Sequence, residues 1–122
     1  MTLAYHASEP LPPGTLITLV FNASPLIFGL PPTAASLDAY LQLLDGTGLR
    51  WMVAALGDVT ASGLAALAIE RGGHVRVGLE DYFGSNQPRN SELVAQVVDL
   101  SRAAGRLVAD SHEAARILAI RR

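Results

Sequence analysis

The sequence predicts an α/β fold built on parallel strands, and three observations lead to this prediction. An apolar, largely β-branched run occupies residues 15–21, and a second apolar run occupies residues 51–56, as in strands that are covered on both faces. Segments with the apolar spacing of helices separate these runs from each other and from a third strand at residues 74–80. Glycines and prolines mark the boundaries. Strands that alternate with helices form parallel sheets through right-handed crossovers.

The composition fits one domain with a substantial core. The chain has 122 residues, of which 50% are hydrophobic and 16% charged, which is too apolar for a disordered chain. Its net charge of −2 gives no reason to expect nucleic acid or a membrane surface as a partner. The absence of cysteine excludes disulfides, thiolate nucleophiles and cysteine-ligated zinc, and it fits a cytoplasmic protein. The longest apolar stretch, residues 16–30, is interrupted and shorter than the ~20 residues of a membrane helix.

The first 14 residues are predicted to be a connector or a frayed terminus. Pro10, Pro12 and Pro13 precede Gly14 there, and such a cluster breaks regular structure. Residues 15–122 are then a single domain. It starts with the strand at 15–21, which a loop at 22–32 follows.

Four helices are predicted from apolar faces and capping residues. The proposed caps are Thr33, then Thr60 or Ser62, then Asn90, then Asp110. Glu113 stands three residues after Asp110, as in a capping box. The fourth helix is a short last helix after Asp110. The predicted buried faces of the first three helices consist of Leu37, Tyr40, Leu41 and Leu44; Leu64, Leu67 and Ala68; and Leu93, Val94, Val97 and Leu100.

The third strand carries the candidate chemistry. Alternation puts Val75, Val77 and Leu79 on one face and Arg76 and Glu80 on the other, and Asp81 follows where the strand ends. An antiparallel strand with one face in water would make these charges ordinary surface groups. Parallel topology favours the other interpretation, in which they face an interior or a cleft at the carboxyl end of the sheet.

Three parallel strands leave two sheet edges open. A barrel needs about eight strands and roughly 250 residues, and uncovered edges invite association. The sequence therefore predicts either a small open sandwich or the end of something larger, and it predicts self-association.

Several segments resemble one enzyme family. Residues 72–81, Gly-Gly-His-Val-Arg-Val-Gly-Leu-Glu-Asp, are similar to the last barrel-strand motif of the β-keto acid cleavage enzymes. The remaining similarity spans about residues 15–119, and its clearest segments are 28–33, 61–73, 90–94 and 114–118.

The resemblance implies a fold and a reaction. The fold would be a partial (β/α)8 barrel, made of the last three βα units plus a C-terminal helix. Family members are oligomeric zinc enzymes that convert a β-keto acid and acetyl-CoA into acetoacetate and a new acyl-CoA. The resemblance implies that Glu80 is a zinc ligand, and that Arg76 and Asp81 form a dyad that deprotonates the keto acid. The zinc would polarise the keto carbonyl as a Lewis acid.

The sequence departs from the family in its histidines. A His₂Glu zinc site needs two histidines beside Glu80, which the family carries as His-x-His, but His6, His74 and His112 are isolated here. Tyr82 also stands where many relatives have asparagine. We therefore expect this chain alone to lack zinc and activity, and to form a homo-oligomer or pair with an N-terminal half. The alternatives are a non-catalytic remnant of a barrel and a small α/β binding module without metal.

Overall fold

A computed structural model describes residues 2–23 and 28–120 of the chain. Its sheet has three parallel strands in the order β1 (Leu16–Asn22), β2 (Arg50–Leu56) and β3 (His74–Val75). This confirms the predicted α/β class with parallel strands, and the antiparallel alternative for the third strand is wrong. Sequential strands that lie side by side in one sheet are the arrangement of consecutive barrel units. The middle of the loop at 22–32 and both ends of the chain lie outside the described residues.

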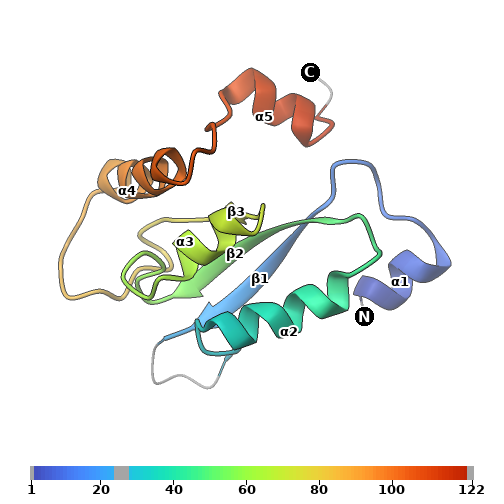
Figure 1. Ribbon diagram of the computed structural model, residues 1–122, viewed down its shortest axis with the longest axis horizontal. Coiled ribbons are helices and arrows are strands. Elements are labelled where there is room, and N and C mark those ends of the chain that lie inside the picture. Colours follow the sequence, from blue (N-terminus) through green and yellow to red (C-terminus); the bar gives the residue numbers. More distant parts are fainter. Residues whose placement is uncertain (1, 24–27, 121–122) are drawn as a thin grey trace.

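Five helices accompany the sheet in the described part (Figure 1). They are α1 (Thr2–Ser8), α2 (Ala34–Leu44), α3 (Leu64–Glu70), α4 (Asn90–Ala103) and α5 (Ser111–Ile117). Helix α1 was not predicted, because the proline cluster dominates the interpretation of residues 1–14. Those prolines begin at Pro10, after the helix has ended, and a proline ends a helix only near its own position. None of the described helices is long and apolar enough to cross a membrane.

The core lies between one face of the sheet and helices α2 and α3. Its largest fully buried side chains are Phe21 of β1, Val53 of β2, Leu37 of α2 and Leu64 of α3. Phe21 also meets the ring of Tyr40 edge to face, with centroids 5.3 Å apart, a favoured aromatic geometry. Helix α4 packs against α3, and α5 lies beyond it, away from the sheet (Figure 1). One face of the sheet is thus well covered.

Two of the predicted helix caps are confirmed and two are wrong. The Thr33 side chain accepts a hydrogen bond from the Ser36 amide, and Asp110 accepts from two amides of α5. Helix α3 starts instead after Gly63, which occupies the cap position with a φ of 78° and has no side chain to cap the helix. Neither Thr60 nor Ser62 is therefore the cap. Helix α4 is capped at Arg89, because the Glu92 carboxylate accepts from the Arg89 amide at 2.7 Å.

The third strand is shorter than predicted. Pairing with β2 covers His74–Val75, and the Arg76 amide adds a hydrogen bond to the Val53 carbonyl at 2.9 Å. The chain then leaves the sheet, so Leu79 is 52% exposed rather than part of an apolar strand face. It turns back at once, since the Asp81 amide donates to the Gly78 carbonyl. The predicted strand over 74–80 therefore ends in a turn.

Candidate active site at the carboxyl end of the sheet

The turn at residues 78–81 returns to the carboxyl end of β2. The Gly57 amide donates to the Asp81 carbonyl at 2.9 Å, and the Phe83 amide donates to the Gly57 carbonyl at 3.2 Å. Gly57 is suited to this position because its φ is 137°, and an added Cβ would lie 2.9 Å from the Ala23 Cβ. The ends of all three strands thus meet at one edge, where α/β folds place their ligands.

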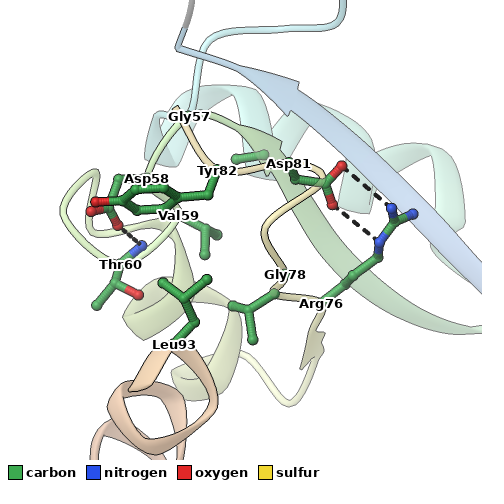
Figure 2. A pocket seen from close by; sticks show the side chains of 11 residues that line it. Gly57, Asp58, Val59, Thr60, Arg76, Gly78, Asp81, Tyr82 and Leu93 are labelled. Carbon is green, nitrogen blue, oxygen red and sulfur yellow. Dashed lines mark hydrogen bonds and ion pairs between the residues drawn. The ribbon is translucent and has the colours of Figure 1, made fainter. Parts of the chain in front are cut away.

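Arg76, Glu80 and Asp81 come together at this edge, as the sequence predicted. Arg76 contacts both carboxylate oxygens of Asp81, with Nε 3.1 Å from Oδ2 and a terminal nitrogen 3.3 Å from Oδ1 (Figure 2). The same terminal nitrogen lies 2.9 Å from Oε2 of Glu80. The contact with Oδ1 is a hydrogen bond and the contact with Oδ2 is an ion pair, so Arg76 holds the Asp81 carboxylate at both oxygens.

The three side chains differ in their exposure to solvent. The Asp81 side chain is 15% exposed, Arg76 42% and Glu80 84%. The Arg76–Asp81 pair is therefore partly withdrawn from water, where a fixed geometry is easier to maintain. The contact with Glu80 is a surface ion pair, and such pairs contribute little to stability. Glu80 can leave Arg76 for another partner at small cost.

A small pocket lies beside the pair. It has a volume of about 10 Å³, which is room for one water molecule at most. Its lining includes residues that the sequence did not assign to a functional site, and Figure 2 shows them around the turn: Gly57, Asp58, Val59, Thr60, Gly78, Tyr82 and Leu93. A keto acid does not fit inside this pocket, so a substrate would have to lie on the open side of the Arg76–Asp81 pair.

Asp58 is the most polar of the residues that were missed. Its Oδ1 accepts from the amides of Thr60 at 3.0 Å and Ala61 at 2.9 Å, an Asx turn that shapes the loop after β2. The sequence indicates that Asp58 lies at this edge of the sheet, because Gly57-Asp58 directly follows a predicted buried strand. These two hydrogen bonds give Asp58 a structural role in the loop.

The histidines lie away from Glu80. His6 is in α1, where its Nδ1 accepts from the Leu11 amide at 3.0 Å, and His112 is in α5. His74 opens β3, at the end of the strand opposite to the turn. Burial, and then the positive charges of Arg106 and Arg50, lower the pKa of His74 below its ordinary value of 6.5. Within residues 2–23 and 28–120, no group of three His, Asp or Glu side chains could hold a metal ion.

A larger groove runs along the outer side of β3. It has a volume of about 560 Å³, and most of its lining is aliphatic. Val75 and Val77 line it from β3 and the residues that follow, Val94 and Val97 from α4, and Leu107 from the segment after α4. Leu107 is 99% exposed, and Val94, which was predicted to be buried, is 50% exposed. Part of the apolar face of α4 is therefore uncovered.

Comparison with known proteins shows which family this chain resembles. The family model described as "beta-keto acid cleavage enzyme" matches residues 2–120. A "3-keto-5-aminohexanoate cleavage enzyme" of Fusobacterium nucleatum subsp. nucleatum is 43% identical over 101 residues, which is 79% of this chain and 37% of that protein. A protein of the same name from Acetoanaerobium sticklandii is 51% identical over 61 residues, which is 47% of this chain and 22% of that protein.

The chain thus spans well under half of the length of these curated relatives. The family model nevertheless covers nearly all of it, including the turn with Arg76, Glu80 and Asp81. A match of this extent shows that the chain belongs to the β-keto acid cleavage enzyme family.

Proposed function

We propose that this chain supplies one part of the active site of a β-keto acid cleavage enzyme. The reaction would combine a β-keto acid with acetyl-CoA and yield acetoacetate and a new acyl-CoA. Membership of the family supports this proposal. The single observation that carries it further is the two-point contact between Arg76 and the partly buried Asp81 at the carboxyl edge of the sheet.

Asp81 is the proposed base. A carboxylate held at both oxygens by Arg76 can accept the proton from the carbon between the two carbonyl groups of the keto acid. The electron pair left on that carbon then attacks the thioester carbonyl of acetyl-CoA and expels coenzyme A as the thiolate. The thiolate attacks the original keto carbonyl, and cleavage of the bond between that carbonyl and the central carbon releases the new acyl-CoA. Protonation of the central carbon then gives acetoacetate. Arg76 keeps Asp81 in place through both contacts.

Zinc does not fit the described residues as a complete site. A catalytic zinc ion usually has three protein ligands, and no such group exists within residues 2–23 and 28–120. The Glu80 carboxylate is 84% exposed and makes a surface ion pair with Arg76, so little free energy opposes its transfer to another partner. We therefore propose Glu80 as a ligand whose two histidine partners come from outside this chain.

The groove beside β3 is the proposed contact surface for that other part. Within the described residues β3 pairs along one edge, with β2, and an uncovered edge favours the addition of a further strand. The exposed Val94 and Leu107 would be buried by the same event. The partner would be an N-terminal barrel half that carries the missing strands.

A non-catalytic partial barrel is the second candidate. The pocket beside Asp81 has a volume of only about 10 Å³, and the described residues provide no three-ligand metal site. Both observations describe a chain that binds no substrate unless a partner completes it. The two candidates differ in what happens when the missing strands are supplied.

The experiment is complementation. The chain is co-expressed with the N-terminal segment of the Fusobacterium relative that precedes the aligned region, and the purified complex is assayed for zinc and for acyl-CoA formation. We expect a complex with stoichiometric zinc that loses activity by 10²-fold or more in Asp81→Asn, while the zinc content is unchanged. In Glu80→Gln both zinc and activity should fall. An active complex that tolerates Asp81→Asn would disprove the assigned base, and a stable complex without zinc or activity would favour the non-catalytic candidate.

A further inference from the structure

The turn that carries Glu80 and Asp81 is held from three directions. Inside the turn, the Asp81 amide donates to the Gly78 carbonyl at 3.3 Å. From β2, the Gly57 amide donates to the Asp81 carbonyl at 2.9 Å. From α4, the side-chain oxygen of Asn90 accepts from the Leu79 amide at 3.0 Å. The first two bonds fix Asp81, and the third fixes the residue directly before Glu80.

Asn90 makes this contact instead of capping its own helix. It is the first residue of α4, a position at which asparagine commonly serves the helix terminus. Here Glu92 accepts from the backbone amide of Arg89 at that terminus, at 2.7 Å, so the amide oxygen of Asn90 is directed to a turn 11 residues earlier in the chain. The Asn90 side chain also lies over Gly78, where an added Cβ would be 3.8 Å from its oxygen.

We propose that Asn90 is a positioning residue for the active site. Its side chain ties the start of α4 to the turn and thereby sets the direction of Glu80 and the alignment of Asp81 with Arg76. This inference rests on the proposed function for its catalytic consequence. The geometric link itself can be measured without any activity.

The exposure of Leu79 makes the turn depend on this hydrogen bond. Leu79 is 52% exposed, so packing does little to hold this part of the turn, and one hydrogen bond has a correspondingly large effect. An amide–carbonyl hydrogen bond contributes about 1 kcal/mol, or roughly fivefold in an equilibrium. Loss of Asn90 should therefore increase the population of open turns about fivefold, and each open turn loses the alignment of Glu80 and Asp81.

The test is NMR spectroscopy of the ¹⁵N-labelled chain, with the Leu79 amide and the Arg76 Nε–H resonance as probes. Asn90→Ala should speed solvent exchange of the Leu79 amide about fivefold and shift or broaden the Arg76 Nε–H signal. Asn90→Asp retains an acceptor oxygen and should restore both signals. Glu92→Ala is the matched control, because it removes the neighbouring hydrogen bond to Arg89 at the same helix terminus and should change neither.

Three results would overturn the inference. They are an Arg76 signal that is unchanged in Asn90→Ala, the same change in Glu92→Ala, and a failure of Asn90→Asp to restore the signals. If Asn90→Ala does not fold, as judged by circular dichroism, Asn90→Ser replaces it in the same measurement. In the complemented enzyme, Asn90→Ala should lower kcat by at most about fivefold, with little change in KM. An inactive complex would count against the proposed function only, since the NMR result stands apart from it.

Discussion

The guanidinium of Arg76 contacts both carboxylate oxygens of Asp81, at 3.1 and 3.3 Å. The two residues are five positions apart, and the turn at 78–81 brings them together. A lysine ammonium is a point charge and cannot make these contacts through two separate nitrogens. The geometry of the pair therefore depends on arginine and not on charge alone.

Arg76→Lys is therefore expected to lower the activity, although it preserves the positive charge. In the complemented enzyme we expect kcat to fall by about 10²-fold, since a misaligned base loses much of its acid–base contribution. The unfolding free energy should change by about 1 kcal/mol at most, because the pair is partly exposed. Steady-state kinetics and urea unfolding measure the two effects. Retention of full kcat in Arg76→Lys would show that the two-point contact is unnecessary.

Arg106 is expected to stabilise the junction between α3 and β3. One of its terminal nitrogens donates to the carbonyls of Ile69 and Gly73, both at 2.7 Å. These carbonyls end the helix and start the strand, and a cation there also complements the helix dipole. Arg106→Ala should therefore reduce the unfolding free energy by about 2 kcal/mol in urea unfolding. Arg102→Ala is the control, because Arg102 makes only an exposed pair with Asp99, and a similar loss in both variants would contradict the assignment.

The elements that the sequence predicts well are those with a local cause. The first two strands follow from apolar runs, and their parallel pairing follows from the helix between them. Thr33 and Asp110 were identified as caps because each bonds an amide two or three residues away. The approach of Arg76 to Asp81 was likewise predictable, since both lie at the end of one strand.

The elements that the sequence predicts poorly depend on distant partners. Alternation continues through residues 74–80, but strand pairing requires a neighbour, and the segment turns back to Gly57 instead. Asn90 is a good local cap, yet the Leu79 amide, far along the chain, takes its oxygen. Arg106 gives no local signal at all, because its acceptors are carbonyls more than 30 residues earlier. Such contacts are tertiary, and no window of neighbouring residues contains them.

Gly73 should be intolerant of a side chain. It is buried at the start of β3, and an added Cβ would overlap the ring of Trp51 on β2. Gly73→Ala must therefore displace the ring or the strand, which should cost about 1–3 kcal/mol of unfolding free energy. Gly78→Ala is the matched control, since its Cβ would meet only Asn90 at 3.8 Å. Thermal unfolding measures both, and equal stability of the two variants would exclude the overlap.

His74 should make the stability of the chain depend on pH. Its pKa is lowered by burial and by the nearby charges of Arg106 and Arg50, so the folded state holds it neutral at pH values where the unfolded state already binds a proton. The unfolded chain then binds more protons than the folded chain as the pH falls through 6.5, and the linkage relation requires that stability decrease there. The decrease stops once the pH is below the pKa of His74 in the folded state.

The prediction is tested by urea unfolding at pH 7.5 and pH 5.5. The wild-type chain should lose more stability between these values than His74→Gln, whereas His112→Gln, which changes an exposed position in α5, should behave like the wild type. NMR titration of the His74 ring supplies a second measurement, because Arg50→Gln removes one of the two nearby positive charges and should raise the His74 pKa toward 6.5. A His74 pKa at or above 6.5 in the wild-type chain would show that burial and the two arginines do not act as described.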